Sequence, residues 1–115
     1  MISPFSDVLS ALVKHRGCTG SMVVGENDGI IVDSNLQTGF RGEVLAALSA
    51  SLYRRARNAA KAAGYGHATF LQLEASAGRV CITGANDLVL LAVAEPKANV
   101  GLIRVELLKG VAALG

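Results

Sequence analysis

A chain of 115 residues has room for one hydrophobic core of ordinary size, so we expect a single domain over residues 1–115. The formal net charge is only +2, and no block of Lys and Arg alternates with aromatic residues, so we expect no binding to nucleic acid. Apolar residues make up 51% of the chain, more than one small core needs, which predicts that some of them lie in a subunit interface.

The apolar residues are not arranged for a membrane or for export. The longest apolar run, residues 88–94, is far shorter than the roughly 18 residues that a spanning helix requires, so no membrane insertion is expected. Residues 1–4 have neither the basic nor the apolar region of a signal peptide, so we expect a cytoplasmic protein. Cys18 and Cys81 stand alone in apolar segments, so both are expected to be buried, reduced packing residues, and no metal site is predicted.

The first third of the chain predicts a helix followed by a β-hairpin. In residues 5–15 the apolar positions have the spacing of one helical face, and Gly17 ends the helix. Residues 18–25 have an apolar centre typical of a strand. Residues 26–29 (Glu-Asn-Asp-Gly) are typical of a hairpin turn, because Asn, Asp and Gly tolerate positive φ. Residues 30–34 are then the returning strand.

The rest of the chain predicts a long helix, three strands and a final helix. Residues 42–63 are rich in Ala, Leu, Arg and Lys, and Gly64 ends this helix. Strands are predicted at residues 69–74, 79–83 and 88–94. The third of these is apolar at every position, which is typical of a central strand covered on both faces. Asn99 is expected to cap the last helix.

The elements therefore follow the order α-β-β-α-β-β-β-α. Tight hairpins join the first two strands and the last three, so the sheet must be largely antiparallel. We expect an α/β fold of the α+β kind, with a five-stranded, mainly antiparallel sheet and helices packed on it.

The long helix is predicted to have two different faces. Its apolar stripe is expected to pack on the sheet and consists of Val44, Leu45, Leu48, Leu52, Ala56, Ala59 and Ala63. The opposite stripe is either a solvated face or a basic docking surface with a floor of small residues. The partner-binding residues predicted on it are Ala46, Ala50, Arg54, Arg57 and Lys61. Arg55 falls on the apolar stripe, where it either extends outward or pairs with a carboxylate.

No residues suggest catalysis. His15 and His67 are the only histidines, and neither is accompanied by a nucleophile. His15 is expected in the last turn of the first helix, where a cation suits the helix dipole. We therefore predict no enzymatic activity, no catalytic residues and no cofactor.

Several of these segments together resemble the Roadblock/dynein light chain family. They are the helix-Gly-strand entry at residues 12–24, the Asp-Gly-Ile-Ile segment at 28–31, the Gly-Tyr-Gly break at 64–66 and the hairpin at 82–93. The segment Asn-Val-Gly-Leu-Ile-Arg-Val-Glu-Leu at residues 99–107 is similar to the last helix of bacterial members. The resemblance covers residues 8–114.

This resemblance implies a strand order of 2-1-5-4-3, a sheet sandwiched by three helices, and a homodimer. The third strands would pair across a two-fold axis, with the second helices side by side. As an unpaired edge strand without Pro, the third strand would be an aggregation hazard, which favours its pairing. The expected dimer-interface residues are Thr69, Phe70, Leu71, Gln72 and Leu73.

The function that the resemblance implies is regulation rather than catalysis. Bacterial relatives regulate small Ras-like GTPases, so the partner expected here is a small GTPase or another switch protein. A structural adaptor of a larger assembly, of the dynein-light-chain or signalling-scaffold kind, is the main alternative. A small-ligand sensor is the third possibility, because sheets with covering helices often have pockets.

Overall fold

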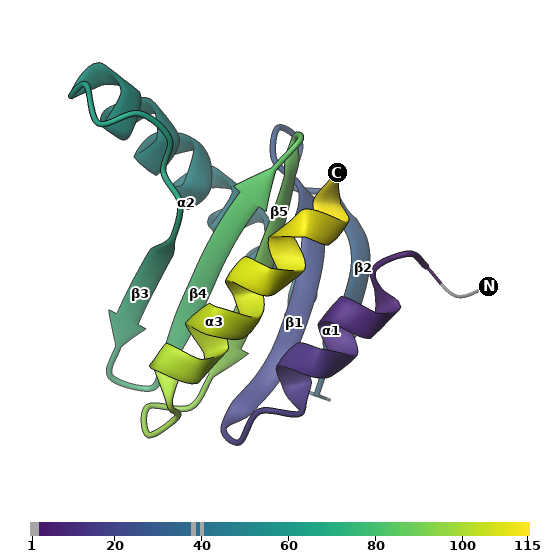
Figure 1. The fold of residues 1–115 in the computed structure, drawn as a ribbon. Helices are drawn as coiled ribbons and strands as arrows, with labels where there is room; N and C mark the ends of the chain where they lie inside the picture. Colours follow the sequence, from purple (N-terminus) through teal and green to yellow (C-terminus); the bar gives the residue numbers. More distant parts are fainter. Residues whose placement is uncertain (1–2, 38, 40) are drawn as a thin grey trace.

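The computed structural model describes residues 3–37, 39 and 41–115, and it has the predicted order of elements (Figure 1). Within these described residues, three helices and five strands follow one another, with a short 3₁₀ helix at the end. Their bounds are α1 Ser6–Val13, β1 Cys18–Gly25, β2 Ile31–Leu36, α2 Gly42–Ala62, β3 Leu71–Ala75, β4 Gly78–Ala85, β5 Leu88–Ala94, α3 Val100–Gly110 and η1 Val111–Leu114.

The five strands form one antiparallel sheet in the order β2-β1-β5-β4-β3, as the family resemblance implied. β5 lies in the middle of the sheet, and its residues 89–92 are fully buried, which confirms the prediction made from its continuous apolar run. The β4–β5 turn has Asn86 and Asp87 at positive φ, the backbone of a tight two-residue hairpin. β2 and β3 are the two edges of the sheet.

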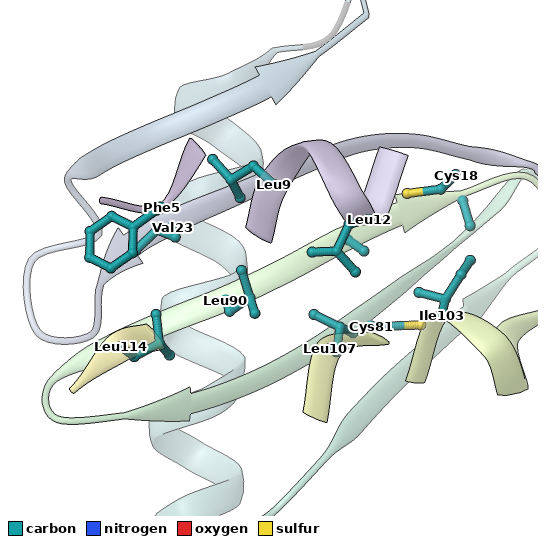
Figure 2. Packing of buried hydrophobic residues seen from close by; sticks show 12 residues of the cluster. Phe5, Leu9, Leu12, Cys18, Val23, Cys81, Leu90, Ile103, Leu107 and Leu114 are labelled. Carbon is teal, nitrogen blue, oxygen red and sulfur yellow. The ribbon is translucent and has the colours of Figure 1, made fainter. Parts of the chain in front are cut away.

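Each face of the sheet has its own hydrophobic cluster. α1 and α3 cover one face, where Leu9, Leu12, Ile103 and Leu107 pack against Leu90 and its neighbours (Figures 1 and 2). α2 crosses the other face, where Ala46, Ala50 and Tyr53 pack on the side chains of β1, β4 and β5. The sheet is thus sandwiched by three helices, as predicted. None of the described helices is long and apolar enough to cross a membrane.

Several local predictions are confirmed, with small shifts at the element ends. The Asn99 side chain accepts a hydrogen bond from the Leu102 amide at 3.2 Å and caps α3 as expected. Cys18 and Cys81 are buried free thiols, and burial raises the pKa of both, that of Cys81 to about 11. His15, expected in the last turn of α1, lies two residues beyond its end.

His15 instead links α1 to α3. Its Nε2 atom lies 3.0 Å from Glu106 Oε1, so the side chain has a carboxylate partner on another helix rather than a role at its own helix end.

Candidate functional site

The orientation of α2 differs from the prediction by about a third of a turn. Ala46 and Ala50 were expected to face outward, but they are buried against the sheet together with Tyr53. Small side chains allow the helix to approach the sheet closely. Gly29, in the turn between β1 and β2, lies so near α2 that a Cβ added to Gly29 would be 3.3 Å from the Cα atom of Ala47. The floor of small residues predicted for a partner is therefore a contact inside the molecule.

The larger apolar side chains of α2 point away from the sheet. Leu48 is 58% exposed and Val44 is 43% exposed, whereas both were predicted to be core residues. Leu45 and Leu52 are half-buried at the edge of the cluster beneath the helix. Arg55 is exposed beyond them. α2 thus has an apolar outer stripe, defined here by Val44 and Leu48, that nothing in the monomer covers among the described residues.

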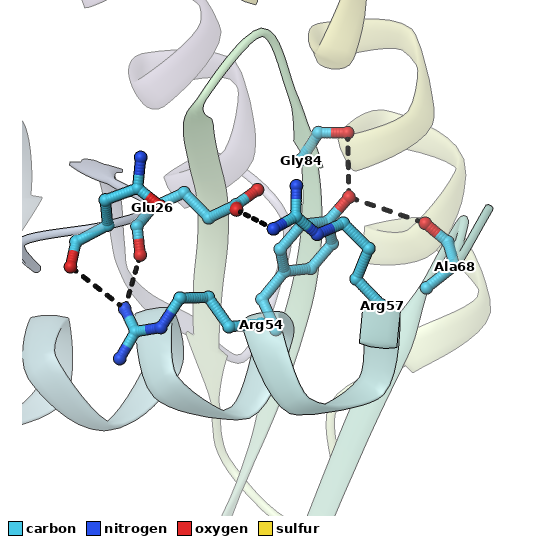
Figure 3. Close-up of polar contacts among 7 residues, drawn as sticks. Glu26, Arg54, Arg57, Ala68 and Gly84 are labelled. Atoms are coloured by element: carbon cyan, nitrogen blue, oxygen red, sulfur yellow. Dashed lines mark hydrogen bonds and ion pairs between the residues drawn. The ribbon is translucent and has the colours of Figure 1, made fainter. Parts of the chain in front are cut away.

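Two arginines of α2 hold the turn between β1 and β2 (Figure 3). Arg54 Nη1 donates to the main-chain oxygens of Glu26 and Asn27, and Arg57 Nη2 lies 2.8 Å from the Glu26 carboxylate. Glu26 is only 3% exposed, so its charge would be costly without this partner. Both arginines were predicted to bind a partner, but their structural role is internal. Lys61, the third predicted basic residue, is exposed.

Tyr53 links α2 to the sheet at Gly84 and to the segment before β3 at Ala68, two residues that are labelled in Figure 3. Its hydroxyl lies 3.2 Å from the Gly84 main-chain oxygen and 3.5 Å from that of Ala68. Burial raises the pKa of this hydroxyl, Glu26 raises it further and Arg57 opposes the shift, so Tyr53 stays a neutral donor. The Tyr53 hydroxyl thus connects α2 to the end of β4 and to the segment that leads into β3.

The residues predicted for the dimer interface lie where β3 begins. Leu71, Gln72 and Leu73 belong to the strand, and Thr69 and Phe70 precede it. Phe70 is half-buried beneath Arg104, whose guanidinium lies 4.9 Å from the ring centre. Leu71 packs on the cluster beneath α2, and Leu73, two residues on, is exposed. The structure thus leaves one apolar side of an edge strand partly open, on the face of the sheet that α2 covers.

Glu26 is the residue that the sequence analysis missed. The sequence predicts for this position only the first residue of a hairpin turn. The available signal was a carboxylate directly after an apolar strand, in a chain whose longest helix has three arginines. In the described part of the chain no three His, Cys, Asp or Glu residues gather as a metal site would require.

Known proteins resemble this chain over most of its length. The family model described as the Roadblock/LC7 domain matches residues 4–95. An uncharacterized protein of Methanocaldococcus jannaschii is 32% identical over 98 residues, which cover 85% of this chain and 85% of that one.

Solved structures share the fold at lower identity. MglB of Myxococcus xanthus has a TM-score of 0.85 and 21% identity, with 98% of this chain and 93% of that chain covered. The gliding protein mglB from Thermus thermophilus has a TM-score of 0.83 and 16% identity, with 99% and 90% covered. A Roadblock/LC7 domain from Streptomyces avermitilis has a TM-score of 0.83 and 18% identity, with 92% and 90% covered.

Proposed function

Because the chain belongs to the Roadblock/LC7 domain family, we propose that it is a non-enzymatic regulatory domain that works as a homodimer on a small Ras-like GTPase. The observation that carries the dimer is the apolar outer stripe of α2, together with the open edge of β3. Both lie on the same face of the sheet, since Leu71 packs in the cluster beneath α2.

A second copy of the chain would cover both features at once. Pairing between two β3 strands satisfies the free main-chain groups of each edge and removes the hazard of an open strand. Two α2 helices side by side would bury Val44 and Leu48, two large apolar side chains one helical turn apart that the monomer leaves exposed. In a dimer with a two-fold axis, both subunits use the same surface patch. One apolar stripe on each chain is therefore sufficient to form the interface.

Light scattering coupled to size-exclusion chromatography tests the dimer. We expect the mass of a dimer for the wild type at micromolar concentration and of a monomer for Leu48→Asp. Val105→Asp is the matched control, because Val105 is 52% exposed but lies on α3, on the other face of the sheet. A monomeric wild type would refute the proposal, as would a Leu48→Asp variant that stays dimeric.

The GTPase partner is supported by the resemblance to bacterial regulators of Ras-like GTPases. With Ala46 and Ala50 buried and two arginines engaged at Glu26, Lys61 is the exposed basic residue left from the predicted docking surface. Charged residues at the rim of an interface mainly affect the association rate of the two proteins. We therefore expect Lys61→Glu to slow association with the partner.

The test uses purified dimer and a Ras-like GTPase from the same genome. We expect binding, and a changed rate of GTP hydrolysis under single-turnover conditions. Binding without a change in that rate would identify a structural adaptor instead. Absence of binding to any such GTPase of the genome would refute the GTPase as partner while leaving the dimer to its own test.

A further inference from the structure

The last helix, α3, is apolar on both of its sides. Ile103 and Leu107 are fully buried against the sheet, whereas Leu102 and Val105 on the outer side are 53% and 52% exposed. The two exposed residues are three positions apart and therefore adjoin on the helix surface. A helix that is apolar all round is normally covered all round. Because α1 and α3 cover the sheet face opposite α2, a dimer through α2 and β3 would leave this outer side uncovered (Figure 1).

A groove lies between α1 and α3, beside these exposed residues. The two helices run side by side in opposite directions (Figure 1). Val8 of α1 packs against Gly110 at the end of α3, and His15, just beyond α1, contacts Glu106. Glu106 is one helical turn after Leu102, so the groove adjoins the exposed apolar side of α3. The hollow between the helices has a volume of about 240 Å³ and is lined by Ala11, Lys14, His15 and Glu106.

The free charges beside this α1–α3 groove are mainly basic. Lys14 at the end of α1 and Lys109 in the last turn of α3 are exposed, and neither has an ion pair among the described residues. Glu106 lies 3.0 Å from His15, so the carboxylate inside the groove already has a partner. Asp7 is exposed in the first turn of α1, two helical turns from Lys14. An occupant of the groove therefore complements it best if it brings carboxylates of its own.

We propose that the α1–α3 groove binds an amphipathic helix of another protein. The apolar side of that helix packs on Leu102 and Val105. Its acidic residues face Lys14 and Lys109. Two neighbouring helices leave a groove into which a third helix can pack, and an amphipathic helix laid in an apolar groove is a recurring mode of peptide recognition.

The charges favour this occupant over two others. A second copy of the chain, related by a two-fold axis, would bring the same groove and the same unpaired lysines against each other. A flat anionic membrane would meet a concave surface that also presents the carboxylates of Asp7 and Glu106. An acidic helix fits the hollow and avoids both conflicts.

Three peptides that share one apolar helical face test the groove. Their leucines follow the i, i+3, i+4, i+7 spacing, and their other side chains are Glu, Gln or Lys. We expect the Glu peptide to bind the purified protein at least tenfold more tightly than the other two in fluorescence anisotropy. In NMR spectra of labelled protein it should shift amide signals of α1 and α3. Equal binding by the three peptides, no binding at millimolar concentration, or shifts confined to α2 would overturn the proposal.

Val105→Asp and Leu48→Asp are a matched pair of variants for this assay. Each places a carboxylate at an exposed apolar position, one on α3 and the other on α2. Val105→Asp should weaken binding of the Glu peptide at least tenfold, whereas Leu48→Asp should bind it like the wild type even as a monomer. The opposite pattern would overturn the proposal. Because Leu48→Asp reports on the dimer and Val105→Asp on the groove, failure of one proposal does not imply failure of the other.

Lys14→Glu tests the charge of the groove. It should weaken binding of the Glu peptide and strengthen binding of the Lys peptide, because the unpaired charge changes sign. Lys61→Glu makes the same change at an exposed position on α2 and should bind both peptides like the wild type. Vesicles of phosphatidylcholine and phosphatidylserine are the last probe. Vesicle binding that Val105→Asp abolishes, without binding of the Glu peptide, would identify a lipid surface instead and overturn the proposal.

Discussion

Replacing Tyr53 with Phe removes one hydroxyl that ties α2 to two other parts of the chain. The hydroxyl donates to the Gly84 oxygen at 3.2 Å, with Ala68 at 3.5 Å as a longer alternative. One hydrogen bond is lost and the ring stays, so no cavity forms and the free energy of unfolding should fall by about 1 kcal/mol. For a domain of this size that corresponds to a drop in Tm of about 4 °C.

Tyr65→Phe is the matched control for this change. Tyr65 is 85% exposed, so loss of its hydroxyl should leave stability within about 0.5 kcal/mol of the wild type. Urea unfolding followed by circular dichroism measures both variants, and amide exchange should show faster opening around Ala68 in Tyr53→Phe alone. The reasoning fails if the two variants lose equal stability, or if exchange near Ala68 does not change.

Three further changes test the packing. Gly84→Ala places a Cβ 2.8 Å from the Tyr53 ring and 2.9 Å from the Leu88 oxygen, and should cost about 1–3 kcal/mol in urea unfolding; an unchanged midpoint would contradict this close contact. Asn99→Ala should cost about 1 kcal/mol, whereas Asn99→Asp should keep the cap of α3 in thermal unfolding. Burial raises the pKa of Cys81 from 9.0 to about 11, so the unfolded thiol ionises first and stability falls as pH rises between these values; Cys81→Ala should show a shallower fall when unfolding is measured at pH 8 and pH 10.5.

The strands could be predicted from the residues because their signals are local. The continuous apolar run at residues 88–94 indicated a central strand, and β5 is central with both faces covered. The Asn-Asp pair before it supplied the positive φ angles of a tight turn. The strand order itself was implied by the family resemblance, because hairpin patterns do not say which strands from separate hairpins lie side by side.

The orientation of α2 could not be predicted from its hydrophobic pattern. The helix has apolar residues on two sides, and the pattern does not tell which side faces the sheet. Large residues were assigned to the core, yet the sheet accepts Ala46 and Ala50, whose small side chains allow close approach. Leu48 remains exposed on the outer side of the helix. This agrees with a chain that has more apolar residues than one small core needs.

The same orientation changes how charge-reversal variants of α2 must be read. Arg57→Glu would place a second carboxylate beside the buried Glu26, so it would lower stability whether or not a partner binds there. Arg54 holds the same turn through main-chain oxygens, and its loss would loosen the turn as well. A weaker partner interaction in either variant would therefore report a disturbed turn. Lys61 is exposed and has no ion pair in the described structure. Reversal of its charge should therefore change partner binding without disturbing the β1–β2 turn.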